Sequence, residues 1–388
     1  MINEAGKIEA ITGERFLPDN RVQLLYQGTE AFNEIFRHIR GASRSICLEF
    51  YIFRNDDTGK RLAEILMEKA RSGIRVYLLY DHFGSLGTPS KFWKMLRTSG
   101  VNVKPSRPFS LREPSGYIRR DHKKLIIIDG ATAFTGGLNI ANEYSGFHLL
   151  SRKVKTMRSR AFSWRDTGVI VSGPVVKKLS EYFAESWKRS ASELIKIAGT
   201  AVQYHDGFPV IPIFASSPRG RRRLRKLLYW SIESSRKNIR LTTAYFTPGP
   251  KLSGKLISAS KRGVNVELLL PFKSDILAAH YAARSFFTTL LRENIRIYLY
   301  HGSILHAKTY IFDDEWSIIG SANLDFRSLR KNDEGNVGIL SREFGDQMKK
   351  LFIQDKERSI PVNMEDWLKR PLCSKAAEKF FALFRRKL

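Results

Sequence analysis

The chain has 388 residues, of which 43% are apolar and 12% aromatic. This length is enough for about two to three domains with buried cores, so a chain that is disordered throughout is excluded. Its 66 lysines and arginines outnumber its 38 aspartates and glutamates, which leaves a net charge of +28. A surplus of this size predicts an anionic partner, either nucleic acid or an acidic membrane surface.

The cysteines and the N-terminus bear on where the protein works. Cys47 and Cys373 are the only cysteines and lack metal-ligand spacing, which is typical of a reducing compartment. Residues 1–9 carry charges where a secretory signal needs an apolar run of about 7–15 residues. No apolar stretch approaches the roughly 20 residues of a membrane span. These features predict a protein that is soluble or peripheral to a membrane, without a signal peptide.

Strand-like and helix-like segments alternate along the chain, and the same order occurs twice. The first copy has a strand at 45–53, a helix that stops at Gly73, a strand at 74–80, a helix at 91–96 and a strand at 101–104. The second has a strand at 238–246, a helix that stops at Gly263, a strand at 264–270, a helix at 285–291 and a strand at 295–299. This alternation predicts two copies of one α/β domain with a largely parallel sheet.

Each copy leads to the same polar motif, H-x-K-x4-D-x6-G-[GS]-x-N. In the first copy it comprises His122, Lys124, Asp129, Gly136 and Asn139. In the second it comprises His306, Lys308, Asp313, Gly320 and Asn323. The two histidines are 306 − 122 = 184 residues apart. A single H-x-K is a weak signal, but two matched motifs disfavour histidines that merely pack within a strand.

The residue types at this spacing fit chemistry on a phosphoryl group. Residues two apart on a strand project to one face, so His122 and Lys124 point the same way and Lys123 points away. A lysine can hold the non-bridging oxygens while the imidazole acts as nucleophile or proton donor. Asn139 and Asn323 would add neutral donors to the same oxygens. We expect the two imidazoles to flank one phosphate-sized gap of about 5–7 Å.

These residues resemble the twin signatures of the phospholipase D superfamily. The segments RDHKKLIIIDG at 120–130, GGLNIANEY at 136–144 and IIGSANLDFRS at 318–328 are most similar to bacterial cardiolipin synthases. The resemblance runs from about Gln23 to the C-terminus. It implies an α/β fold of two pseudo-twofold-related α/β/α sandwich lobes with mostly parallel mixed sheets. It also implies one active site at the lobe interface, with no cofactor and no metal.

On this basis the chain divides into four parts. An N-terminal segment at 1–22 precedes the first lobe at 23–200, the second lobe covers 201–358, and a basic amphipathic tail covers 359–388.

Acids downstream of each motif are further candidates. Asp166 aligns with Glu334, and an acid bonded to an imidazole fixes its tautomer and raises its basicity. We expect Asp166 to orient His122, ahead of Glu143, which has no counterpart in the second copy. A surface acid that begins a strand is the alternative. Asp129 and Asp313 join the catalytic candidates, although their place before a turn equally fits a structural role.

Basic segments are candidates for contact with the anionic partner. The acids are 334 − 166 = 168 residues apart, so the first copy carries 16 extra residues between motif and acid, which include the basic Ser151–Arg160. That segment fits either a headgroup-contacting loop or a solvated linker. Arg219–Lys226 opens the helix that leads into the second copy. Lys375–Leu388 has the pattern of an interfacial helix, and a helix packed on its own domain is the alternative.

The resemblance implies transfer of a phosphatidyl group between phospholipids, two phosphatidylglycerols giving cardiolipin and glycerol. His122 would form a phosphohistidine and His306 would act as acid and base. The expected partners are phospholipid substrates and an anionic phospholipid membrane, approached peripherally from the cytoplasmic side. The alternatives are a phospholipase D or a nuclease or phosphodiesterase that hydrolyses a phosphodiester at the same two histidines. A non-catalytic protein that binds nucleic acid or membrane is disfavoured because both motifs are intact.

Overall fold

The computed structural model describes residues 2–109, 119–146, 164–199 and 202–385, and the basic segment Ser151–Arg160 lies outside them. The first lobe contains β1 Leu17–Leu25, α2 Gly28–Arg40, β2 Ser45–Phe50, α3 Asp57–Arg71, β3 Arg75–Asp81, α4 Ser90–Thr98, β4 Asn102–Ser106, β5 Lys124–Ile128, β6 Thr132–Gly136, α5 Asn142–Ser145, β7 Gly168–Ser172 and α6 Val175–Ala191. These elements reproduce the strand and helix order that the sequence predicts for the first copy.

The second lobe repeats this order and is followed by two further helices. It contains β8 Phe208–Phe214, α7 Pro218–Ser234, β9 Asn238–Thr242, α8 Pro250–Lys261, β10 Asn265–Pro271, α9 Leu277–Arg284, α10 Phe287–Arg292, β11 Arg296–Tyr300, β12 Thr309–Phe312, β13 Trp316–Gly320, α11 Phe326–Arg330, β14 Gly335–Leu340, α12 Arg342–Glu357 and β15 Ser359–Pro361. Before and after the lobes lie α1 Ile2–Thr12, α13 Met364–Lys369 and α14 Leu372–Ala382. None of the described helices is long and apolar enough to cross a bilayer.

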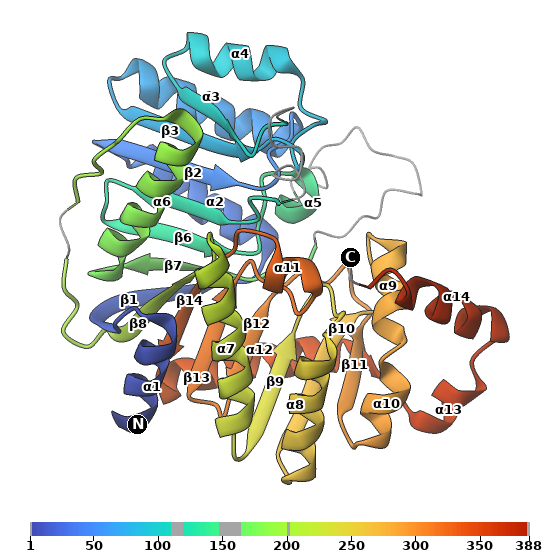
Figure 1. Ribbon diagram of the computed structural model, residues 1–388. Coiled ribbons are helices and arrows are strands. Elements are labelled where there is room, and N and C mark those ends of the chain that lie inside the picture. The colour runs from blue at the N-terminus through green and yellow to red at the C-terminus, as the bar shows by residue number, and fades with distance from the viewer. Residues whose placement is uncertain (1, 110–118, 147–163, 200–201, 386–388) are drawn as a thin grey trace.

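The strands form one continuous sheet that passes through both lobes (Figure 1). Its order is β4-β3-β2-β5-β6-β7-β1-β8-β14-β13-β12-β9-β10-β11-β15. The order reads the same from either side of the β1–β8 junction until β15, so the two lobes are related by a pseudo-twofold axis at that junction. The two-lobe α/β architecture implied by the resemblance is confirmed.

The sheet is mixed, but the expectation that it is mostly parallel is corrected. Among the described strands, four pairings are parallel and ten are antiparallel. Parallel pairing is confined to the strand–helix–strand units β2-β3-β4 and β9-β10-β11. The motif strands β5 and β12 instead return through tight hairpins to β6 and β13, and a short hairpin can join only antiparallel strands.

Strand composition explains where the sheet is covered on both faces. All residues of β2, β5 and β12 are buried, as expected for strands with helices on either side. Each lobe has its own core on one face. A third core on the other face spans both lobes, where α6 supplies Phe183 and Trp187 and α12 supplies Phe344 and Phe352. The lobes therefore share a packed layer as well as a sheet.

Residues near both ends of the described chain join the elements of the lobes, and the expected division of the chain into four parts stays a prediction. β1 begins at Leu17 and so includes residues assigned to the N-terminal segment, and Ile8 of α1 is buried in the core of the second lobe. At the other end, β15 pairs with β11 and Trp367 of α13 is buried in the same core. The terminal segments thus pack on the second lobe.

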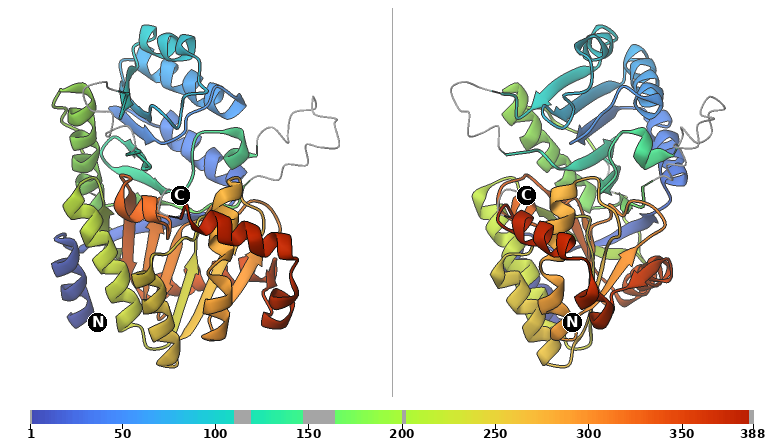
Figure 2. Two further views of the ribbon diagram at one scale, coloured as in Figure 1. Left: turned by 45° about the vertical axis from the view of Figure 1, so that its right-hand side comes forward. Right: turned by 90° about the vertical axis from the view of Figure 1, so that its right-hand side faces the viewer.

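The C-terminal helix α14 lies on the outside of the second lobe (Figure 2). Its buried Glu378 pairs with Arg284 of α9 and with Arg370, and Phe381 stacks on Tyr281 at 5.8 Å between ring centroids. Phe380, Leu383 and Phe384, by contrast, are exposed. The helix packs on its own domain along one side, and contact of the other side with a membrane stays a prediction.

Candidate active site

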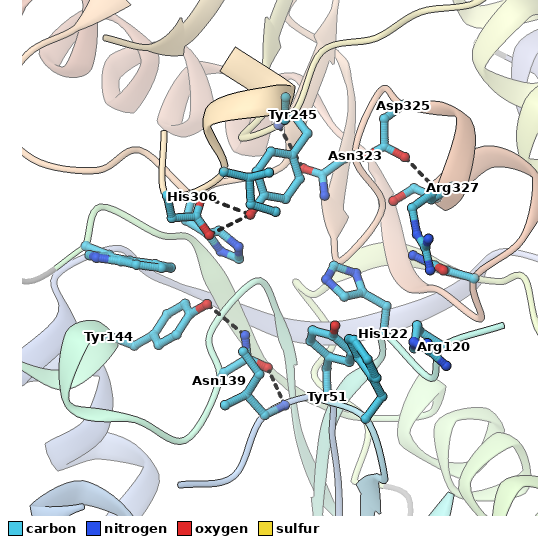
Figure 3. A pocket seen from close by; sticks show the side chains of 18 of the residues that line it. Tyr51, Arg120, His122, Asn139, Tyr144, Tyr245, His306, Asn323, Asp325 and Arg327 are labelled. Carbon is cyan, nitrogen blue, oxygen red and sulfur yellow. Dashed lines mark hydrogen bonds between the residues drawn. The ribbon is translucent and has the colours of Figure 1, made fainter. Parts of the chain in front are cut away.

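A cavity of about 410 Å³ lies between the two lobes and is lined by both motif histidines (Figure 3). His122 lies two residues before the start of β5, and His306 lies three residues before β12. The two histidines, 184 positions apart in sequence, therefore line one cavity between the lobes. The predicted single site at the lobe interface is therefore present, while the predicted width of the gap between the imidazoles stays a prediction.

The chain segments before the histidines are held by the opposite lobe. The backbone N–H of His122 donates to the carbonyl of Asp333 at 2.9 Å, and that of His306 donates to the carbonyl of Arg165 at 2.7 Å. Asp333 and Arg165 each directly precede one of the candidate acids. This interlocking brings each acid to the histidine of the other lobe.

The acids pair with the histidines crosswise, which corrects the expectation that Asp166 orients His122. Glu334 accepts from Nδ1 of His122 at 3.0 Å, and Asp166 accepts from Nδ1 of His306 at 2.7 Å. Because an ionised carboxylate can only accept, Nδ1 carries the proton and Nε2 is the nitrogen left for chemistry. The rival candidate Glu143 pairs with Arg54 instead, at 3.1 Å.

The two carboxylates are held ionised and the two imidazoles neutral. Burial works to raise the pKa of Asp166, but Lys308 and His306 outweigh it and hold that pKa below its usual value. The pKa of Glu334 is lowered in the same way, against burial, by His122 and Lys124. Burial lowers the pKa of His122, and burial together with Lys308 lowers that of His306 to about 4. Each imidazole is therefore favoured as the free base at neutral pH.

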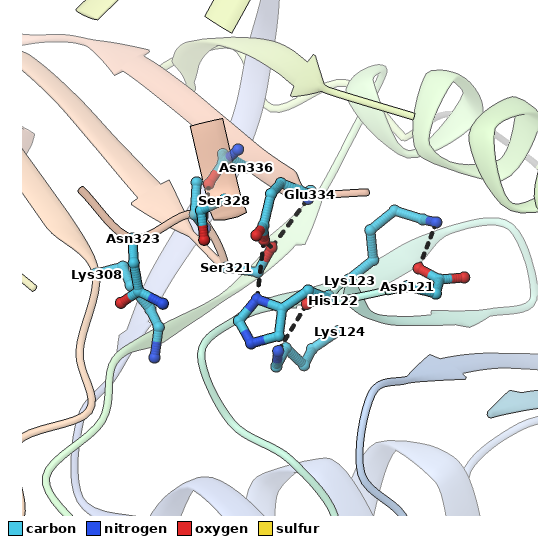
Figure 4. A network of polar contacts seen from close by, with 12 residues as sticks. Asp121, His122, Lys123, Lys124, Lys308, Ser321, Asn323, Ser328, Glu334 and Asn336 are labelled. Atoms are coloured by element: carbon cyan, nitrogen blue, oxygen red, sulfur yellow. Dashed lines mark hydrogen bonds and ion pairs between the residues drawn. The ribbon is translucent and has the colours of Figure 1, made fainter. Parts of the chain in front are cut away.

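The motif lysines are buried beside their own histidines (Figure 4). Lys124 Nζ donates to the carbonyl of His122 at 2.6 Å. Lys308 donates to the carbonyl of His306 and lies 2.7 Å from Nδ1 and 3.1 Å from Nε2 of that ring. Burial, reinforced by the charge of Lys308, lowers the pKa of Lys124 to about 7, and burial lowers that of Lys308 to about 8. Their role in holding phosphate oxygens stays a prediction.

Lys123 points away from the site, as the strand period predicts. It is fully buried, and its ammonium lies 2.9 Å from Glu49 and 2.6 Å from Asp121 (Figure 4). The side chain therefore belongs to the buried ionic contacts beneath the site rather than to the cavity.

The two asparagines line the cavity but differ in the hydrogen bonds that their side chains already make. Asn139 accepts from the backbone N–H of Ile52 at 3.1 Å and donates to the hydroxyl of Tyr144 at 2.9 Å. Asn323 accepts from Tyr245 N–H at 3.4 Å, and its amide nitrogen points into the cavity (Figure 3). Asn323 is thus the better placed of the two to donate to a bound phosphate.

Asp129 and Asp313 lie at the far ends of their strands, so their inclusion among the catalytic residues is corrected. The carboxylate of Asp129 accepts from the backbone N–H groups of residues 43, 44 and 45. That of Asp313 accepts from those of residues 236, 237 and 238. Both aspartates have positive φ, 55° and 52°. They fasten the turn after each motif strand to the start of the neighbouring strand β2 or β9, which is a structural role.

The sequence reasoning missed most of the cavity wall. Three aromatic rings surround His306: Tyr144 at 5.3 Å, Trp164 at 5.4 Å and Tyr245 at 6.2 Å between centroids. Among the described residues, the ring contact of His122 is with Tyr51, at 4.9 Å between centroids. Five of the missed lining residues lie within the quoted segments, where proximity could have flagged them: Arg120, Tyr144, Asp325, Arg327 and Ser328.

No group of three or more metal-ligating side chains occurs within residues 2–109, 119–146, 164–199 and 202–385. The positive charge nearest the histidines is instead supplied by Lys124 and Lys308. The site can therefore carry out nucleophilic and acid–base chemistry on an anionic group with these side chains.

Comparison with known proteins relates more than half of the chain to one family. A family model described as cardiolipin synthase, PLD-like domain, matches residues 35–149 and 228–356. A probable cardiolipin synthase YwiE of Bacillus subtilis is 32% identical over 369 residues, which is 94% of this chain and 72% of the relative. Cardiolipin synthase A of Pseudomonas putida is 33% identical over 357 residues, 90% of this chain and 71% of the relative.

Solved structures resemble the fold at lower sequence identity. The phosphatidylserine synthase of Haemophilus influenzae matches over the whole of both chains with a TM-score of 0.70 and 16% identity. A polyphosphate kinase of Porphyromonas gingivalis matches 95% of this chain and 56% of its own, with a TM-score of 0.55 and 13% identity. At these identities the likeness concerns the fold alone.

Proposed function

Because the chain belongs to the phospholipase D-like family of cardiolipin synthases, we propose that it is a phosphatidyltransferase that converts two phosphatidylglycerols into cardiolipin and glycerol. One observation carries the proposal. Two neutral imidazoles from separate lobes line one cavity, and each is held by a carboxylate from the opposite lobe. A double displacement at phosphorus needs one nucleophile and one acid–base group, and the cavity holds one of each.

In the first step Nε2 of His122 attacks the donor phosphorus, forming a P–N bond as the P–O bond to glycerol breaks. His306 gives its proton to the departing glycerol oxygen. In the second step the hydroxyl of another phosphatidylglycerol loses its proton to His306 and attacks phosphorus, and the P–N bond breaks. The assignment of His122 as nucleophile follows the family resemblance. An anionic phosphodiester bound nearby raises the pKa of His306 from about 4 and so favours the imidazolium that the first step requires.

The proposed reaction needs no metal ion. Lys124 and Lys308 are buried against the two histidines and, in their protonated form, can bind the non-bridging oxygens. Turnover should therefore persist in EDTA. Loss of turnover that added metal restores would contradict this part of the proposal.

We place an anionic bilayer against the mouth of the cavity. The loops after β3 and β10 carry exposed apolar side chains at matching positions, Leu86 (59% exposed) and Ile276 (42%), each five residues beyond the end of its strand. Ile276 lines the cavity, and Lys91 and Lys273 are exposed beside these loops. Apolar tips flanked by lysines complement acyl chains and anionic headgroups.

Sedimentation with vesicles tests this contact. We expect binding to require acidic lipid and to weaken as salt rises, and Leu86→Ser combined with Ile276→Ser to weaken it about tenfold through lost apolar burial. Met95→Ser, at an exposed apolar position on α4, is the matched control. Equal pelleting with neutral and acidic vesicles would contradict an anionic membrane as the partner.

Product analysis tests the activity itself. Phosphatidylglycerol vesicles should yield cardiolipin and glycerol in equal amounts, and His122→Ala should abolish both. Phosphatidic acid in place of cardiolipin would identify a phospholipase D. Cleavage of DNA in a parallel reaction, with no change in lipid, would identify a nuclease and overturn the proposal.

A further inference from the structure

One pair of equivalent positions, in the loops after β3 and β10, carries different side chains in the two lobes. Ser85 and Asp275 each lie four residues beyond the end of their strand, β3 and β10. Ser85 is buried, and its hydroxyl accepts from the backbone N–H of Phe53 at 3.1 Å. Asp275 is exposed and lines the cavity. The position in the first lobe that is equivalent to Asp275 therefore carries no carboxylate.

Asp275 is held beside His306 by a tyrosine. The hydroxyl of Tyr245 lies 2.9 and 2.8 Å from the two carboxylate oxygens, and the Tyr245 ring lies 6.2 Å from that of His306 (Figure 3). The Ser274 hydroxyl lies 3.3 Å from one of the same oxygens. Burial lowers the pKa of His306, and Asp275 opposes this, as a nearby carboxylate does. The carboxylate is thus oriented toward the acid–base side of the cavity.

A carboxylate is an unexpected wall for a site that binds a phosphodiester, because like charges repel. It is well suited to accept hydrogen bonds from hydroxyl groups, since an ionised carboxylate has about four acceptor sites and Tyr245 and Ser274 do not use them all. The guanidinium groups of Arg120 and Arg327 lie on the His122 side of the same cavity (Figure 3). Asp325 also lines the cavity on that side, where its carboxylate accepts from the backbone N–H of Ser328, so Asp275 is the carboxylate beside His306.

We propose that Asp275 and Tyr245 form a binding subsite for the hydroxyl groups of the glycerol headgroup, next to His306. This inference rests on the proposed function. The subsite holds the alcohol that leaves in the first step and the alcohol that attacks in the second, both within reach of the group that exchanges its proton. It also favours a polyhydroxyl acceptor over water and over a simple alcohol.

Competition between two acceptors tests the subsite. Cardiolipin vesicles are incubated with a mixture of glycerol and 1-propanol, and phosphatidylglycerol and phosphatidylpropanol are measured. The wild-type protein should prefer glycerol by about 10- to 100-fold, the worth of a hydrogen bond to a charged group. Asp275→Asn should lose most of this preference while it still forms phosphatidylpropanol. Tyr245→Phe should fall between, because the carboxylate remains but its orienting hydroxyl is gone.

Controls separate the possible failures. Asp366→Asn, at an exposed position on α13 away from the cavity, should leave the ratio unchanged. A ratio that stays the same in Asp275→Asn, or an equal loss with both alcohols, would overturn the subsite. If ethanolamine as acceptor suffers more than glycerol in Asp275→Asn, the carboxylate binds an ammonium and the proposal is overturned. Absence of any lipid product with the wild-type protein would instead refute the proposed function.

Discussion

The two lobes place the same motif on the same strand, yet the halves of the site they build are not alike. On one side, within the part of the chain that the structure describes, His122 contacts the ring of Tyr51 and lies near Arg120 and Arg327. On the other, His306 is surrounded by three aromatic rings and approached by Asp275. The fold is nearly symmetric and the cavity is polarised.

The difference extends to the acids behind the rings. In the second lobe the Ser321 hydroxyl donates to Glu334. The equivalent position in the first lobe is Gly137, where a Cβ would overlap the carboxylate of Asp166. In the first lobe the acid is the shorter Asp166, and the glycine beside it leaves no room for a side chain. In the second lobe the acid is the longer Glu334, which accepts a hydrogen bond from the Ser321 hydroxyl. Each lobe thus solves the same orienting task with a different pair of residues.

Duplication of the domain builds the two-lobe framework, and single residue differences between the lobes make the two ends of the site unequal. Two identical halves could bind a phosphodiester equally well either way round, and the reaction would have no defined nucleophile. Asp275 beside His306 and the guanidinium groups of Arg120 and Arg327 toward His122 make the two ends unequal, because phosphate and alcohol then prefer different ends of the cavity.

The largest expected effect comes from removing either histidine. His122→Ala and His306→Ala should each lower turnover by at least about 10⁴-fold, because one removes the nucleophile and the other the acid–base group. To identify the nucleophile, the reaction of the wild-type protein is quenched in base during turnover and the masses of its peptides are measured by mass spectrometry. We expect the phosphatidyl adduct on the peptide that contains residue 122. An adduct on residue 306 would reverse the roles, and adducts on both would remove the polarity.

Next in size are the acids, which test the crosswise pairing. Glu334→Gln and Asp166→Asn should each lower kcat by about 10²- to 10⁴-fold, because the imidazole loses its fixed tautomer. Histidine nitrogen NMR identifies which ring is affected. Glu334→Gln should shift the Nδ1–H signal of His122, and Asp166→Asn that of His306. Perturbation of the histidine in the same lobe would contradict the crosswise arrangement.

A matched pair of substitutions at the glycine–serine position should give unequal effects. Gly137→Ser should lower kcat by about 10- to 100-fold, because its side chain displaces the carboxylate that orients His306. Ser321→Gly should cost about tenfold, because Glu334 keeps its bond to His122 and loses only the hydroxyl. Steady-state kinetics on phosphatidylglycerol measure both. Equal effects would mean that the two lobes brace their acids alike.

The lysines predict a fall in activity at alkaline pH. Burial lowers the pKa of Lys124 to about 7 and that of Lys308 to about 8, so both lose their charge as pH rises through this range. We expect kcat/KM to fall about tenfold between pH 7 and 9. A bound phosphate raises both pKa values, so kcat should fall only at higher pH. Lys124→Arg should flatten the kcat/KM profile, and identical profiles for kcat and kcat/KM would contradict a role in phosphate binding.

Much of the framework could be predicted from the sequence. The repeat of strand, glycine-stopped helix and strand is local, and the twin motif is visible without any knowledge of tertiary contacts. The position of His122 and Lys124 on one strand face follows from the period of two. A single site between the lobes is implied by the resemblance, and it is present because the segment before each motif strand pairs with the opposite lobe.

The exchange of acids could not be predicted in this way. Aligning the copies places Asp166 downstream of His122 in the same lobe, and nothing local reveals that the backbone before each histidine pairs with the opposite lobe. Strand direction was missed for a related reason, since hairpin and crossover connections are hard to tell apart from composition alone. The cavity polarity depends on Asp275, which lies in a loop without any motif.

The smallest effect on catalysis is expected at Asp129 and Asp313, where the lobes should behave alike. Asparagine tolerates their positive φ, so Asp129→Asn and Asp313→Asn test the hydrogen bonds without adding backbone strain. We expect unchanged kcat and a loss of about 1–2 kcal/mol in the free energy of unfolding, because an amide accepts fewer of the backbone N–H groups than a carboxylate.

Burial works to raise the pKa of Asp129, but those hydrogen bonds outweigh it and lower the pKa. The stabilisation is therefore present at neutral pH and is lost as pH falls through the lowered pKa, so wild-type and Asp129→Asn proteins should converge in acid. Denaturant unfolding at pH 7 and pH 3 measures this, and a kcat that falls with Asp129→Asn in a stably folded protein would return the aspartate to the catalytic group.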